Sequence, residues 1–240
     1  MLRRLLAAFA SAAALAFVPS QAAILDLTDR SVFSGAPQSG AWINNIAGSG
    51  INVFIESQGG ATNTNERGPT GWFCANDPML ACESDGVGIG DDEITARRNE
   101  SITLTFSTGI TLVEVYFLDL FKRHANSTDA RDIETAVTEL WTGNTAAGFT
   151  KIGTLFTDAS LHNGGGFERE TLTQLTRVDR LVFRAGSGRD DGSSDFALAG
   201  LNFASTQGRL TASTPVPGAL PLFLAGAIGL GAARRRRKLL

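Results

Sequence analysis

The sequence predicts an all-β fold, specifically an antiparallel β-sandwich of jelly-roll type. Apolar and polar residues alternate in several segments, which is typical of strands with one buried face. These segments are short and rich in Thr, Val, Ile and Phe, and Gly, Asn, Asp or Ser separate them. Outside the two ends of the chain, no window shows a long apolar stripe of helical period. Many short strands with turns between them indicate a sandwich or a barrel.

The clearest strand is expected at residues 101–107, where Ile102, Leu104 and Phe106 alternate with Ser and Thr. Gly109 is expected to turn the chain into a more central strand at 111–118, so that the two form a hairpin. The last strand is strongly apolar, and we expect it to pair near the strand that begins the domain. The first and last strands are expected at 24–27 and 196–204, and the others at 51–57, 135–142, 150–157, 169–175 and 177–184.

Residues 1–22 have the organisation of a cleavable signal peptide. Arg3 and Arg4 precede an apolar stretch of 14 residues, and Ser20 and Ala22 are small residues at the positions that a signal peptidase reads. The apolar stretch is short for a retained membrane anchor, which is the alternative. We therefore expect export, with signal peptidase as a partner and cleavage after Ala22.

Residues 214–240 join a Pro-containing spacer to an apolar segment and a basic run. From Pro215 to Ala233 no side chain is charged, and these 19 residues are about the minimum for crossing a hydrocarbon core of roughly 30 Å. Basic residues beside a spanning segment stay in the cytoplasm. All residues before this segment are therefore expected to lie outside the cytoplasm. A plain C-terminal anchor is one interpretation. The basic run is Arg234, Arg235, Arg236, Arg237 and Lys238.

This tail resembles the PEP-CTERM class of bacterial sorting signals, in particular the VPLPA-CTERM variant. It departs from that variant at Thr214, where Val is usual, and at Gly218, where Ala is usual. The resemblance implies a Gram-negative bacterium and recognition by an exosortase, a membrane enzyme that acts near the motif and releases or transfers the ectodomain. It also implies a transient stay in the inner membrane and a destination at the cell surface or in the extracellular polysaccharide matrix. The corresponding motif here is Thr214, Pro215, Val216, Pro217 and Gly218.

Between the two terminal segments, residues 23–213 suit a single domain with a sizeable core. Seven of the 21 basic residues lie in the terminal segments, whereas all 24 acidic residues lie between Asp26 and Asp195. The intervening part therefore carries a net charge of −10. This charge argues against nucleic acid as a partner and favours solubility or cation binding.

Cys74 and Cys82 are predicted to form a disulfide that closes a nine-residue loop. Between them, Asn76, Asp77 and Pro78 favour a turn, and an exported protein meets an oxidising environment. A zinc site would need two further ligands, and the histidines, His124 and His162, stand alone in the sequence.

Two acidic clusters precede apolar segments and are candidates for a structural calcium site. Calcium takes six to eight oxygen ligands, which loops at one end of a sandwich can supply if the clusters meet there. The spacing does not match an EF-hand, and solvated acidic loops are the alternative. The clusters are Asp85, Asp91, Asp92 and Glu93, and Asp190, Asp191 and Asp195; the proposed ligands are Asp91, Asp92, Glu93 and Asp195.

The sequence has no GxSxG, HExxH or CxxC motif and no phosphate-binding Gly loop, so we expect the protein not to be an enzyme. A hydrolase with an unrecognised site is the weaker alternative. A carbohydrate-binding module of the exopolysaccharide matrix is the stronger one, because exposed aromatic rings stack on sugars. The candidate rings are Trp42, Trp72, Trp141 and Tyr116. Packing in the core or in a loop is the competing role for Trp72 and Trp141.

Overall fold

The computed structural model describes residues 22–32, 39–64, 74, 79–90, 93–161, 166–186 and 194–205. All of them belong to one compact unit, Ser20–Gln207. Within these ranges the regular structure is almost entirely strand, which confirms the all-β prediction. The first elements are β1 (Ala22–Asp26), β2 (Ala41–Ile43), η1 (Ile46–Gly48), β3 (Val53–Gln58), β4 (Thr62–Asn63), β5 (Gly88–Ile89) and η2 (Ala96–Arg98). They are followed by β6 (Ser101–Leu118), η3 (Ala130–Asp132), β7 (Thr135–Asn144), β8 (Gly148–Asp158), β9 (Glu168–Ala185) and β10 (Ala197–Ser205).

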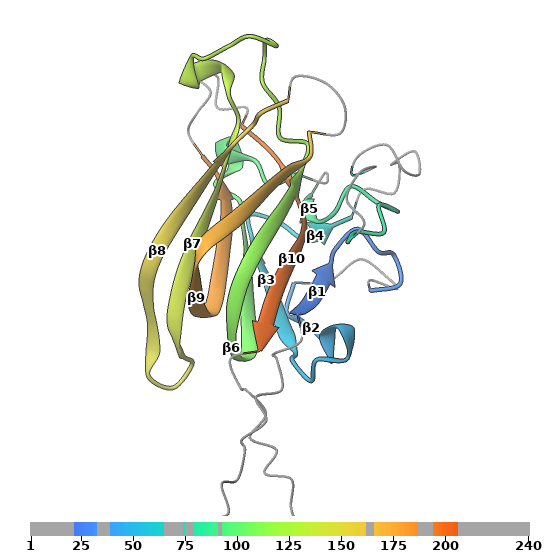
Figure 1. Ribbon diagram of the computed structural model, residues 1–240, viewed down its shortest axis with the longest axis vertical. Coiled ribbons are helices and arrows are strands. Elements are labelled where there is room, and N and C mark those ends of the chain that lie inside the picture. Colours follow the sequence, from blue (N-terminus) through green and yellow to red (C-terminus); the bar gives the residue numbers. More distant parts are fainter. Residues whose placement is uncertain are drawn as a thin grey trace, which may run out of the picture. The chain divides into compact units, whose positions relative to one another are not determined.

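Eight strands form one antiparallel sheet, with β6 near its centre (Figure 1). One path through the sheet runs β1-β10-β6-β9-β7-β8, and β2 joins it through β3, which also pairs with β6. One edge of β6 pairs with β9, and its other edge is shared by β3 along the first half and β10 along the second. A separate two-stranded sheet consists of β4 and β5.

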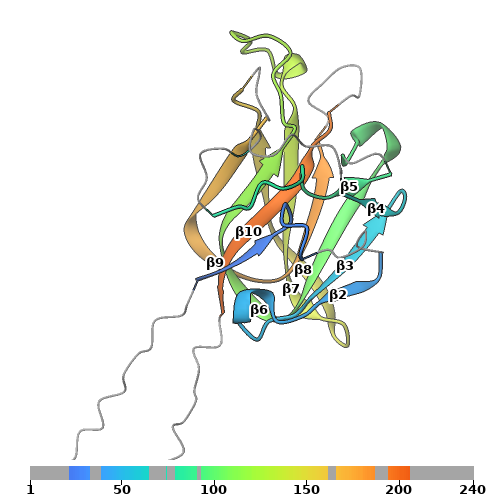
Figure 2. The same cartoon turned by 90° about the vertical axis from the view of Figure 1, so that its right-hand side faces the viewer.

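The first and last strands of the unit pair as predicted. Strand β1 runs antiparallel to β10, from Ala22 opposite Ala204 to Asp26 opposite Gly200 (Figure 2). Leu25 and Leu201 are buried at this pair because both strands turn apolar residues toward the core. The two ends of the unit therefore lie on adjacent strands.

The predicted hairpin at Gly109 is wrong, because β6 continues through that residue as one strand of 18 residues. Its pairing with β9 shifts register between Thr105 and Ile110, so the extra residues form an irregularity and not a turn. A Cβ atom at Gly109 would lie 2.6 Å from Nε of Arg177 and 2.7 Å from Oδ1 of Asp179. A larger residue at this position would require these two side chains to move. Similarly, the two strands predicted at 169–175 and 177–184 form the single strand β9.

Two hydrophobic clusters lie on opposite faces of β6. The main core contains Val115 and Phe117, and the Phe117 ring meets that of Phe196 edge-on at 5.3 Å. A smaller cluster lies on the other face and includes Tyr116 and Leu118. The consecutive apolar residues 115–118 are therefore all buried, as expected for a strand that is covered on both sides.

Candidate functional site

The predicted disulfide between Cys74 and Cys82 is confirmed, with the two Cα atoms 5.8 Å apart. Cys74 is buried in the smaller hydrophobic cluster with Leu80, Tyr116 and Leu118. The segment closed by the disulfide therefore contributes to the cover over the outer face of β6.

Polar contacts from the end of β1 hold this segment in place. The Asp26 carboxylate accepts hydrogen bonds from the backbone N–H of Ala81 at 2.6 Å and from the N–H and hydroxyl of Thr28 at 2.9 and 2.6 Å. The Thr28 hydroxyl oxygen in turn accepts a bond from the N–H of Cys82 at 2.9 Å. These polar groups form hydrogen bonds with one another, so we assign them a structural role.

The segments that carry the two acidic clusters lie side by side at Glu93 and Asp195. The N–H of Ile94 donates to the carbonyl of Phe196 at 2.7 Å, and the N–H of Ala96 donates to the carbonyl of Ser194 at 3.0 Å. Four of the acidic residues lie outside the described residues: Asp91, Asp92, Asp190 and Asp191. Among those described, no group of three or more His, Cys, Asp or Glu side chains is placed to hold a metal ion. The calcium site stays a prediction.

Several other predicted features also lie outside the described residues. They are the signal peptide up to residue 21, the whole tail 214–240 with its Pro motif and Arg run, Trp72 and His162. His124 is described and is exposed. Within the described ranges, no helix has both the length and the apolar character needed to span a membrane.

The three described aromatic candidates differ in exposure. Tyr116 is fully buried and its hydroxyl donates to Glu114 at 2.6 Å, so its ring is not available to a ligand. Trp141 is half-buried, and its Nε1 atom is covered and has no hydrogen-bond partner in the described part of the chain. Trp42 is 52% exposed, and its ring contacts the ring of Phe54 at 5.1 Å. Trp42 is thus the most accessible of the three rings.

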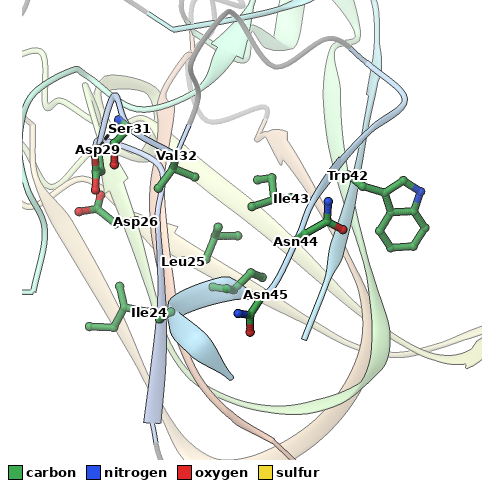
Figure 3. Close-up of a pocket in the computed structure, with 12 residues that line it drawn as sticks. Ile24, Leu25, Asp26, Asp29, Ser31, Val32, Trp42, Ile43, Asn44 and Asn45 are labelled. Atoms are coloured by element: carbon green, nitrogen blue, oxygen red, sulfur yellow. Dashed lines mark hydrogen bonds between the residues drawn. The ribbon is translucent and has the colours of Figure 1, made fainter. Parts of the chain in front are cut away.

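A cavity of about 430 Å³ lies between β1, β2 and η1, with Leu25, Ile43 and Asp26 among its lining residues. Trp42 is also among the residues that line this cavity, and Figure 3 shows its ring pointing away from Ile43. The Asp26 carboxylate is already bonded to Thr28 and Ala81.

Trp42 is the first of a row of side chains that crosses five strands. The row lies on the outer face of the sheet, which is the face away from the main core. The cross-strand partners are Trp42 with Phe54, Phe54 with Thr105, Thr105 with Arg180, and Arg180 with Trp141. We call these five residues the transverse row. Neighbouring strands lie about 4.8 Å apart, so the row is about 19 Å long.

The position of the transverse row follows from the alternation of side chains along each strand. Next to its members, Ile55, Leu104, Leu181 and Leu140 are buried in the main core. The row therefore faces away from that core. Each of its members is exposed or half-buried.

Arg180 lies within the row and is held from two sides. Its Nε donates to the Thr105 hydroxyl at 3.1 Å, and its guanidinium carbon lies 3.8 Å from the centroid of the Phe149 ring. These contacts fix the orientation of the guanidinium group. The ring contact is a cation–π interaction, which is strongest where water is partly excluded.

A second charged group lies beside the row at Glu139. Its carboxylate accepts from Lys151 at 2.7 Å and from Arg184 at 3.4 Å. Partial burial raises the pKa of Glu139, but the hydrogen bond and charge of Lys151 and the charge of Arg184 bring that pKa below its usual value. Glu139 is therefore an ionised partner of these two cations.

Sequence reasoning considered Trp42 and Trp141 but not the row that contains them, because the row depends on the register of strands far apart in the chain. Arg180 belongs to no sequence motif that could have pointed to it.

Comparison with known proteins found no matching family model, curated protein or solved structure.

Proposed function

We propose that the protein is an exported, non-enzymatic protein of the cell surface or extracellular matrix, sorted and processed by an exosortase-like membrane enzyme. Its ectodomain is a β-sandwich of jelly-roll type between a signal peptide and a tail that spans the inner membrane until processing. The observation that carries the proposal is the order of Pro motif, apolar stretch and Arg run in residues 214–240. The Cys74–Cys82 disulfide supports export, because disulfides persist in oxidising compartments.

The sorting proposal is tested by Pro217→Ala and by deletion of residues 234–238, each in the full chain. In the bacterium of origin, both variants are expected to accumulate as an unprocessed, membrane-bound form on immunoblots of membrane and medium fractions. Arg131→Ala is the matched control, since it removes an exposed cation far from the tail in sequence. If both tail variants were processed and released like the wild type, the proposal would fail.

A second candidate function is carbohydrate binding, which the transverse row favours over a purely packing role for the tryptophans. Aromatic rings offer flat apolar faces, and Trp42 and Phe54 present two of them on the outer face of the sheet. Trp141 stands at the other end of the row. A row of this length suits a polysaccharide lying across the strands. No specific observation favours the hydrolase alternative.

Affinity electrophoresis of the full chain in gels with embedded polysaccharides tests this second candidate. Trp42→Ala is expected to abolish the retardation seen with the wild type, and Trp141→Ala to weaken it. Phe156→Ala removes a ring that is 66% exposed but outside the row, and it should leave the retardation unchanged. Equal retardation of the wild type and Trp42→Ala would argue against binding at the row.

A further inference from the structure

We infer that the ligand of the transverse row is an acidic polysaccharide whose carboxylates pair with Arg180. This inference rests on the proposed carbohydrate binding and specifies its ligand.

The first argument is that Arg180 differs from the other cations of the same sheet. Lys151 and Arg184 share the Glu139 carboxylate, Arg169 lies 4.0 Å from Glu114, and Arg177 lies 3.8 Å from Asp179. Within the described part of the chain, Arg180 has no ion pair with a carboxylate. Its charge is thus available to an anion from outside. The net charge of −10 of residues 23–213 repels a polyanion at long range, so binding has to come from a short-range contact at Arg180.

The second argument is that Arg180 is already oriented. Its Nε is engaged by Thr105 and one face of its guanidinium by Phe149, which leaves the two terminal nitrogens without a hydrogen-bond partner in the described residues. Two such nitrogens form a planar fork that matches the two oxygens of a carboxylate. Because the side chain is held before binding, less conformational entropy is lost when the anion arrives.

The third argument is the arrangement of neighbours. Phe54 and Trp42 lie on one side of Arg180 along the row, beyond Thr105, and Trp141 lies on the other side. Aromatic faces accept the apolar faces of sugar rings, whereas the guanidinium accepts a negative group. A chain of acidic sugars provides both groups repeatedly, so it satisfies the row as a unit.

The test uses the full chain and acidic polysaccharides paired with uncharged forms of the same backbones. The probes are polygalacturonate, alginate and hyaluronate, each with its fully methyl-esterified form. At least one acidic chain is expected to bind about ten-fold or more tightly than its ester, because a hydrogen-bonded charge pair is lost in the ester.

Variants locate the effect. Arg180→Gln is expected to remove the preference for the acidic form while weak binding to the ester remains, and Arg180→Lys to restore only part of it, because an ammonium group lacks the fork. Arg131→Gln, on an exposed arginine elsewhere, should behave like the wild type. Unfolding midpoints of all variants show whether the fold is retained.

The outcomes separate the two proposals. Equal binding of an acid and its ester by the wild type would overturn the acidic ligand and leave carbohydrate binding in place. This comparison needs no variant, so it holds even if Arg180→Gln fails to fold. Binding of the esters but not of the acids would also overturn the acidic ligand and leave carbohydrate binding in place. Binding of none of the six probes, with no retardation by neutral polysaccharides, would overturn both proposals.

Discussion

The carboxylate of Asp26, at the end of β1, accepts a hydrogen bond from the backbone N–H of Ala81, 55 residues further along the chain, at 2.6 Å. The bond links the first strand of the sheet to the segment closed by the disulfide. Because Asp26 also accepts from Thr28, one side chain organises both the end of the strand and the cover over β6.

We expect Asp26→Ala to lower the free energy of unfolding by about 2 kcal/mol, the range for losing hydrogen bonds to a charged group. Urea unfolding followed by tryptophan fluorescence measures this change. Asp29→Ala is the control, since Asp29 accepts one exposed bond from the next-but-one residue, Ser31, and it should cost less than about 1 kcal/mol. Equal losses in the two variants would contradict the role given to Asp26.

Replacing Cys74 and Cys82 together by Ala is expected to cost about 2–3 kcal/mol, because a loop of this length restricts the unfolded chain by that amount. The wild type with and without a reducing agent, in urea unfolding, provides the measurement. The double variant should be insensitive to the reductant. A wild type of unchanged stability after complete reduction would show that the packing of Leu80 and the hydrogen bonds to Asp26 and Thr28 hold the segment without the disulfide.

Stability should depend on Glu114 under acidic conditions. Partial burial raises the pKa of Glu114, but hydrogen bonds from Tyr116 and Asn202 and the charge of Arg169 bring that pKa below its ordinary value of 4.5. A carboxyl group whose pKa is lower in the folded state stabilises the fold above its ordinary pKa, and this contribution is lost as the pH falls.

The urea midpoint of the wild type is therefore expected to fall as the pH is lowered from 6 to about 3. In Glu114→Gln this fall should be smaller, because the variant has no carboxyl group to protonate at this position. Glu56→Gln, on an exposed side chain, is the control. Parallel pH profiles for the wild type and Glu114→Gln would count against this explanation.

Gly86 and Gly50 both have positive φ angles, +95° and +75°, but only Gly86 of the two is in close contact with a strand, β10. A Cβ atom at Gly86 would lie 2.5 Å from the carbonyl oxygen of Leu198, whereas one at Gly50 would have no neighbour within 4 Å. Gly50→Ala should cost about 1 kcal/mol for the backbone conformation alone. Gly86→Ala should cost about 3 kcal/mol, because backbone must also move. Thermal unfolding of the two variants tests this order.

The sequence predicted the strands where one face is buried and the alternation is plain. The pairing of the last strand with the first is an example, since Leu25 and Leu201 both belong to the core. The prediction failed at Gly109, because a glycine within a continuous strand has the same sequence pattern as a glycine in a turn. Only the pairing register distinguishes the two cases.

The transverse row could not be predicted for a related reason. Trp42, Arg180 and Trp141 are distant in the chain, and neither composition nor spacing brings them to one line. A shift of one residue in a single strand would move its member of the row to the other face. The unbroken registers of β3 with β6, of β6 with β9 up to Thr105, and of β9 with β7 are therefore as important to this surface as the aromatic residues themselves.

The antiparallel pairing of β1 with β10 also has a mechanical consequence. Ala22 and Ala204 are opposite each other, so the chain enters and leaves the sheet at the same end of this pair. A force that pulls residues 22 and 205 apart acts on the hydrogen bonds of the pair one after another, beginning at that end. Under such tension β1 would peel away first, while the central pair of β6 and β9 remained unloaded.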